Sequence, residues 1–177
     1  MLPFYVPKTS QGFTLIEQLI IILMVGILAS MVAPSFQGIS NRSKVNAAAN
    51  QLQGALREAQ RQAIRKSQDC TVTLPATNTT SPKIPPSGTT NPCLVTGTRT
   101  LNDVTIRHNL GSLTPANEIT FDLRGGLAAG GTIVLSIPNG TPQQKCIVIS
   151  GSMGLIRSGN YLQTDTTGTD EDDCTSQ

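Results

Sequence analysis

One carboxylate lies inside an otherwise apolar stretch near the beginning of the chain. Residues 13–33 read FTLIEQLIIILMVGILASMVA, and Glu17 is the only ionisable residue among them. A carboxylate at the centre of a membrane helix costs about 2.5–3.5 kcal/mol unless it meets a partner, and less near the end of the helix. Glu17 is therefore the first candidate for a functional residue. The alternative is a side chain that extends to the membrane edge.

Four cysteines are widely spaced along the rest of the chain. None belongs to a C-x-x-C pair, which argues against a zinc ribbon or a thioredoxin-type site. An even number of cysteines after an export segment indicates two disulfides formed in an oxidising compartment. The sequence allows three pairings. We favour Cys70–Cys93, which closes a loop rich in Pro and Thr, and Cys146–Cys174, which attaches the acidic tail to a strand; four free thiols are the alternative.

Charge is distributed unevenly, although the net charge is only +2. Arg57, Arg61 and Arg65 recur at i, i+4 and i+8, which places them in one basic stripe on a helix. Residues 165–174 contain five acids and no base. The stripe suits contact with an acidic neighbouring subunit or with DNA, but we favour a solvated helix face. The tail lacks the spacing and glycine of a calcium loop, so we expect a solvated terminus and no metal site.

The sequence offers no residues for enzyme chemistry. His108 is the only histidine, and neither a G-x-S-x-G nor an H-E-x-x-H motif is present. The glycine pairs at 125–126 and 130–131 suit hairpin turns rather than a phosphate-binding loop. We therefore expect a protein that is not an enzyme and binds no cofactor.

The apolar stretch has the length of a membrane span. At about 1.5 Å per residue, a helix over residues 13–33 covers a bilayer core of about 30 Å. A cleaved signal peptide is the less favoured reading, because Ala33 is followed by Pro34, which makes a poor cleavage site. Lys8 precedes the span while Arg42 and Lys44 follow it, which counts against a cytoplasmic N-terminus. We nevertheless expect an exported C-terminal part, because its cysteines suit the periplasm.

Helical periodicity continues beyond the apolar stretch and then gives way to alternation. An Ala-rich stripe predicts an amphipathic helix over residues 35–68, continuous with the first segment but bent or locally melted at Pro34 and loosened at Gly26. Period-two patterns predict strands at 70–74, 104–108, 118–123, 132–137, 145–150 and 154–159. The stretch over residues 75–98 is rich in Pro and Thr, which predicts a long loop. The expected fold class is α+β, with a long N-terminal helix packed on an antiparallel sheet domain over residues 69–177.

The residues around the start of the apolar stretch resemble the signal of the type IV pilin superfamily. The string from Gly12 to Glu17 reads GFTLIE, with Gly26 and Pro34 at the family's helix positions. The resemblance implies a leader over residues 1–12, cleavage by a prepilin peptidase between Gly12 and Phe13, and N-methylation of Phe13. It also implies that Glu17 neutralises the new amine of a neighbouring subunit, where a charge-assisted pair in a low dielectric fixes register.

The C-terminal part resembles one branch of that superfamily, the GspH/FimT-type pseudopilins and minor pilins. The resemblance rests on the Ala/Arg-rich helix end and on the segments ITFDLRGG and CIVISGSMGLIRSG. Some FimT-like proteins bind DNA through a Gly-Arg-x-Arg turn, and here the matching residues are Gly154, Leu155, Ile156 and Arg157. Because the first arginine is absent and an acidic tail follows, DNA is a less favoured partner.

These resemblances imply a minor pilin of a type IV pilus, acting in its assembly-initiation or tip complex. The implied partners are other pilins, the prepilin peptidase, the inner-membrane assembly platform and, before assembly, the membrane itself. The implied location is the bacterial inner membrane with the C-terminal domain in the periplasm, and then the pilus. The alternatives are a DNA-binding competence pilin, a type II secretion pseudopilin, and a membrane-anchored periplasmic domain without a filament.

Overall fold

The computed structural model describes residues 12–86, 92–110, 117–138, 143–162 and 168–176, without the side chains of 31–35 and 176. It divides into two compact units, Met1–Ile39 and Ser40–Gln177. We describe each unit by itself. The expected leader, apart from Gly12, lies outside the described residues.

A single helix, α1 (Leu15–Lys66), accounts for the N-terminal part of the chain. It agrees with the predicted helix over 13–68 and continues without interruption through Gly26 and Pro34. Local melting at Pro34 is therefore not observed, although proline lacks the N–H that an interior helix position normally donates. The bend predicted at these two residues stays a prediction.

The apolar first segment was expected to cross a membrane over residues 13–34. Among the residues that the structure describes, no helix combines the length and the sustained apolarity that crossing a membrane requires.

The second unit is built from antiparallel strands. A six-stranded sheet has the order β10-β9-β8-β7-β5-β2, while β1 pairs with β6 and β3 with β4. The strands are β1 (Cys70–Thr73), β2 (Thr79–Thr80), β3 (Lys83–Ile84), β4 (Arg99–Thr100), β5 (Thr105–His108), β6 (Glu118–Phe121), β7 (Gly131–Ser136), β8 (Gln144–Ile149), β9 (Ile156–Tyr161) and β10 (Cys174–Ser176). The six strands predicted from alternation are all present, which confirms the α+β class.

The prediction of a long loop over residues 75–98 is wrong in part. β2 and β3 lie inside it, and β2 extends the main sheet by pairing with β5. Each of these strands has only two residues, so no alternation could reveal them. The segment is also attached at two points, because Cys93 is joined to Cys70 at the start of β1 and the Lys66 Nζ of α1 donates to the Pro92 carbonyl at 3.1 Å.

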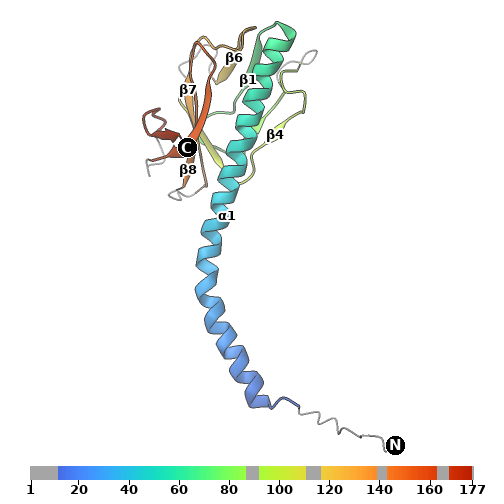
Figure 1. The fold of residues 1–177 in the computed structure, drawn as a ribbon, viewed down its shortest axis with the longest axis vertical. Helices are drawn as coiled ribbons and strands as arrows, with labels where there is room; N and C mark the ends of the chain where they lie inside the picture. Colours follow the sequence, from blue (N-terminus) through green and yellow to red (C-terminus); the bar gives the residue numbers. More distant parts are fainter. Residues whose placement is uncertain (1–11, 87–91, 111–116, 139–142, 163–167, 177) are drawn as a thin grey trace, which may run out of the picture. The chain divides into compact units, whose positions relative to one another are not determined.

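The hydrophobic core lies between one face of α1 and one face of the sheet (Figure 1). Leu52, Ala55, Leu56 and Ala59 of the helix are completely buried. Small alanines let the helix backbone approach the strands, and each fully buried leucine contributes roughly 1.5–3 kcal/mol. The helix-facing sheet residues alternate with residues that point to the opposite face, where Val134, Cys146 and Tyr161 form a second, smaller cluster with Cys174.

Candidate assembly surface

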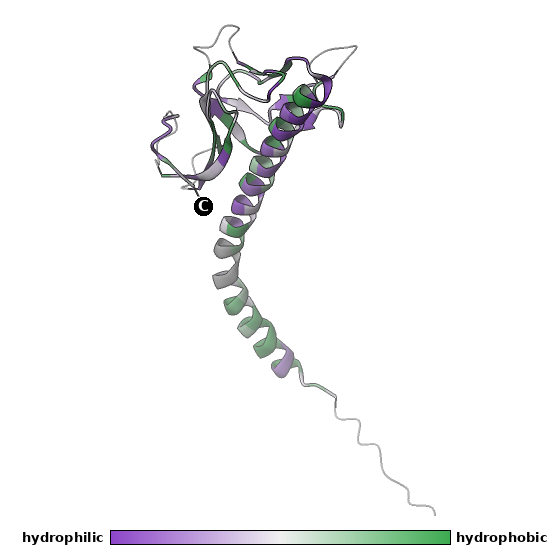
Figure 2. Ribbon diagram, turned by 45° about the horizontal axis from the view of Figure 1, so that its top comes forward, coloured by the Kyte–Doolittle hydropathy of each residue, from purple (hydrophilic) through white to green (hydrophobic). Residues whose placement is uncertain are grey.

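Hydrophobic residues follow one another along the first part of α1 (Figure 2). Their side chains are exposed. From Phe13 to Leu28, the large hydrophobic side chains are between 45% and 81% exposed. The members of this apolar helix surface are Phe13, Leu15, Ile16, Leu19, Ile20, Ile21, Ile22, Leu23, Met24, Val25, Ile27 and Leu28. A contiguous exposed apolar surface of this kind marks a site of contact with protein or lipid. It is a surface for packing, not for chemistry.

Glu17 lies in the first turn of α1 and is exposed. Its backbone N–H donates to the Thr14 Oγ1 at 3.3 Å, so Thr14 caps the helix. Within the described residues, no ion pair includes the Glu17 carboxylate. The carboxylate also lies where the partial positive charge of the helix N-terminus stabilises an anion. Glu17 is thus held at the edge of the apolar helix surface with its charge available to a partner.

Thr14 is a site residue that the sequence analysis missed. A Ser or Thr followed three residues later by Glu is the capping-box signature, and Thr14-Leu15-Ile16-Glu17 fits it. The signature could have located the beginning of the helix, two residues after the predicted start at Phe13. It also gives Glu17 a local structural role beside its expected role in assembly.

The resemblance also involves two glycines, Gly12 and Gly26, and the proline Pro34. A Cβ added at Gly12 or at Gly26 would meet no atom within 4 Å, so neither glycine is required by a close approach within the described residues. Pro34 lies among the residues whose side chains are not described. Cleavage after Gly12 and methylation of Phe13 stay predictions.

The predicted basic stripe exists on the second part of α1. Arg57, Arg61 and Arg65 are exposed, and the Arg61 Nε donates to the Arg57 carbonyl of its own helix at 3.2 Å. Glu58 is the one acid between residues 42 and 66, and its carboxylate is engaged elsewhere. It accepts from the Thr96 N–H at 3.0 Å and from Arg99 at 3.0 Å. The stripe therefore keeps its positive charge.

The turn that matches the DNA-binding motif of FimT-like proteins is used structurally. Gln60 Nε2 donates to the carbonyls of Gly125 and Gly154 at 2.8 and 2.9 Å, which fixes two turns against the helix. Arg157 is paired with Glu171 at 2.9 Å. Leu155 is exposed and apolar. This arrangement offers no cluster of free positive charge for a phosphate backbone at that turn.

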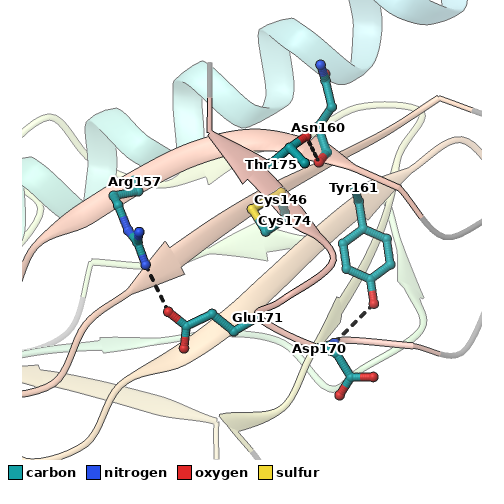
Figure 3. Close-up of a disulfide and its surroundings, with 8 residues drawn as sticks. All are labelled: Cys146, Arg157, Asn160, Tyr161, Asp170, Glu171, Cys174 and Thr175. Atoms are coloured by element: carbon teal, nitrogen blue, oxygen red, sulfur yellow. Dashed lines mark hydrogen bonds and ion pairs between the residues drawn. A yellow bond between two sulfur atoms is a disulfide. The ribbon is translucent and has the colours of Figure 1, made fainter.

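The acidic tail is attached to the sheet face opposite the helix (Figure 3). Cys146 and Cys174 form a disulfide with Cα atoms 5.8 Å apart, and the Asp170 N–H donates to the Tyr161 hydroxyl at 3.0 Å. Both disulfides are the pairs favoured from the sequence. In the described part of the chain, no group of three His, Cys, Asp or Glu residues is placed to hold a metal ion.

His108, the one histidine, lies in β5 and is buried. Its Nε2 is 2.9 Å from the Pro75 carbonyl, and it therefore helps to join the start of the 75–98 segment to the main sheet. This contact places His108 in a structural position.

Comparison with known proteins gives the family. The model of the family described as type II transport protein GspH matches residues 48–153. A crystal structure of the type IV minor pilin FimU from Pseudomonas aeruginosa superposes with a TM-score of 0.50 at 16% identity, covering 67% of this chain and 90% of that one. No curated protein sequence matches significantly. The structural likeness shows a shared fold, and the family model covers more than half of the chain. The chain therefore belongs to the GspH family of the type IV pilin superfamily.

Proposed function

We propose that this chain is a minor pilin of a type IV pilus, that it acts in the assembly-initiation or tip complex, and that it enters the filament through its first helix. The observation that carries the proposal is the apolar helix surface, exposed from Phe13 to Leu28 within its own unit. Covering this surface with similar helices removes it from water, which is the main favourable term in association.

Glu17 and Phe13 give this packing its register. Cleavage after Gly12 would create a positive amine at Phe13, at the same end of the helix as the Glu17 carboxylate. In a bundle of such helices the amine of one subunit and the carboxylate of the next would form a charge-assisted pair in an apolar environment. An unpaired charge there is strongly unfavourable, so subunits in the wrong register are disfavoured. Before assembly, the same apolar segment would hold the precursor in the inner membrane, with the second unit in the periplasm.

Mass spectrometry of the mature chain tests the proposal. The expected product begins with N-methylated Phe13, and it appears only in cells that contain a prepilin peptidase. A mature chain that still begins at Met1 contradicts the proposal. Co-purification with sheared pili, rather than with the secretion machinery, tests the choice of filament.

A type II secretion pseudopilin is the second candidate. The description of the matching family model favours it. The sequence Pro34-Ser35-Phe36, which resembles the minor subunits of type IV pili, favours the pilus instead.

A further inference from the structure

The exposed face of α1 in the second unit carries positive charge without an acidic partner. The basic stripe described above, formed by Arg57, Arg61 and Arg65, is called the arginine ridge from here on. Among the ion pairs of the described residues, none includes a ridge arginine. Glu58, the nearest acid in sequence, already binds Arg99. The ridge therefore carries a positive charge that no acidic side chain of the described residues compensates.

A fourth arginine and apolar side chains lie beside the ridge. Arg124 is exposed and immediately precedes Gly125, whose added Cβ would lie 2.9 Å from the Cδ1 of Ile64. Ile64 is 50% exposed, and Leu123 of the same turn is 51% exposed. Because Gln60 holds this turn by its hydrogen bond to the Gly125 carbonyl, the surface is fixed before any partner arrives. Fixed charges around an apolar centre suit a protein partner that presents carboxylates.

The same unit presents exposed carboxylates on the sheet face that points away from α1. We define the acidic segment as residues 170–173, of which Asp170, Glu171 and Asp172 are exposed. The disulfide to Cys146 and the Tyr161 hydroxyl hold it on the sheet face that points away from α1 (Figure 3). The sheet lies between the acidic segment and the ridge, so the two cannot pair within one copy.

We infer that the arginine ridge of one copy binds the acidic segment of a second copy. The inference rests on the proposed filament role and names the contact between the β-rich units. A contact that joins two different surfaces is heterologous and can repeat from one subunit to the next. When the first helices already hold the subunits together, the two charged surfaces meet at a high effective concentration. A weak ionic contact then forms more readily.

The test measures self-association of the full chain in a neutral detergent by sedimentation velocity. Raising salt from about 0.05 M to about 0.5 M shortens the Debye length from roughly 14 to roughly 4 Å. Association through the ridge should therefore weaken by about tenfold or more. Association through the apolar helix surface should change little, because it does not depend on charge.

Two charge-reversed variants make the test specific. Arg57→Glu/Arg61→Glu and Asp170→Lys/Asp172→Lys should each lose the salt-dependent association, and a mixture of the two should regain it, since each variant then complements the other. Arg42→Glu/Lys83→Glu changes the net charge equally at exposed positions outside the ridge and should associate like the wild type.

The inference is overturned if both ridge and segment variants associate like the wild type, if their mixture does not recover association, or if the control variant loses it as strongly. If filaments still incorporate the ridge variant, the chain can act as a pilin without this contact, and the proposed function stands. Only failure of the wild-type chain to enter filaments contradicts the proposed function itself.

Discussion

The Glu58 carboxylate accepts two hydrogen bonds from Thr96, one from the backbone N–H at 3.0 Å and one from the hydroxyl at 2.6 Å. Arg99 adds an ion pair at 3.0 Å. Thr96 follows Cys93 closely, so the same segment is held to α1 by Glu58 and to β1 by the Cys70–Cys93 disulfide. A residue of the basic helix thus supports the segment that was predicted to be a long loop closed by this disulfide.

Glu58→Gln should make stability less dependent on pH. Burial alone would raise the pKa of Glu58, but the hydrogen bonds from Thr96 and the charge of Arg99 outweigh burial and lower it. Because its pKa is lower in the folded state than in the unfolded state, ionised Glu58 stabilises the fold. This contribution is complete above the ordinary glutamate pKa and is lost as the pH falls through the pKa of the folded state. We expect Glu58→Gln to cost about 1 kcal/mol near neutral pH and little in acid, as measured by thermal unfolding across that range.

Thr96→Val is the matched control for Glu58. It removes the hydroxyl hydrogen bond and leaves the ion pair with Arg99 in place. It should cost less than Glu58→Gln at neutral pH. A Glu58→Gln difference that stays constant from neutral to acidic pH would show that the charge of Glu58 does not contribute.

Gly154→Ala should destabilise the second unit more than Gly97→Ala. Both glycines have positive φ, +60° and +86°, so both substitutions strain the backbone. An added Cβ at Gly154 would lie 2.0 Å from the Gly125 carbonyl oxygen, whereas at Gly97 it would meet nothing within 4 Å. We expect about 1 kcal/mol at Gly97 and at least about 3 kcal/mol at Gly154. Denaturant titration of the two variants measures the difference, and equal losses would contradict the contact between the two turns.

Removing the Cys146–Cys174 disulfide should release the acidic segment before the sheet unfolds. The bond closes a loop with a sequence separation of 28 residues. Its loss costs about 3.6 kcal/mol in the chain-entropy account. Limited proteolysis of the Cys146→Ala/Cys174→Ala variant should cut after residue 162 while the remaining sheet resists. The Cys70→Ala/Cys93→Ala variant is the control, because its bond lies at the other side of the unit and its C-terminal segment should stay protected.

Periodicity predicted the elements that are long enough to show it. The second part of the 52-residue helix and the six predicted strands were evident because their buried residues recur with the period of each structure, while the first part of the helix was evident from its unbroken apolarity. β2, β3, β4 and β10 were missed, since strands of two or three residues have no period. They form because neighbouring backbone offers partners, as when Thr79 pairs with Ile106. This is a property of the tertiary fold, not of the local sequence.

The site residues divide in the same way. Glu17 and the arginine ridge are visible from residue type and spacing alone. The hydrogen bonds from Gln60 to the carbonyls of Gly125 and Gly154 span 65 and 94 positions in the sequence. No local sequence pattern predicts contacts between residues so far apart. Thr14 had a local signal in the capping box that it forms with Glu17.

Glu17→Ala and Thr14→Ala should separate assembly from helix capping. Both residues act at the first turn of α1, where the Glu17 N–H donates to the Thr14 Oγ1. Thr14→Ala removes the cap, which costs about 1 kcal/mol of local helix stability, but leaves the carboxylate in place. If Glu17 neutralises the amine of a neighbouring subunit, Glu17→Ala should prevent incorporation into filaments, while Thr14→Ala should only reduce it.

Counting the variant chain in sheared filaments and in membranes measures this difference. Both variants should reach the membrane in normal amounts, because neither substitution makes the apolar segment more polar. Glu17→Gln refines the test, since it keeps the size and polarity of the side chain but removes its charge. Incorporation of Glu17→Gln at the wild-type level would assign Glu17 to the structure of its own helix. Loss of Glu17→Gln from filaments, alongside the merely reduced incorporation of Thr14→Ala, would require the negative charge itself.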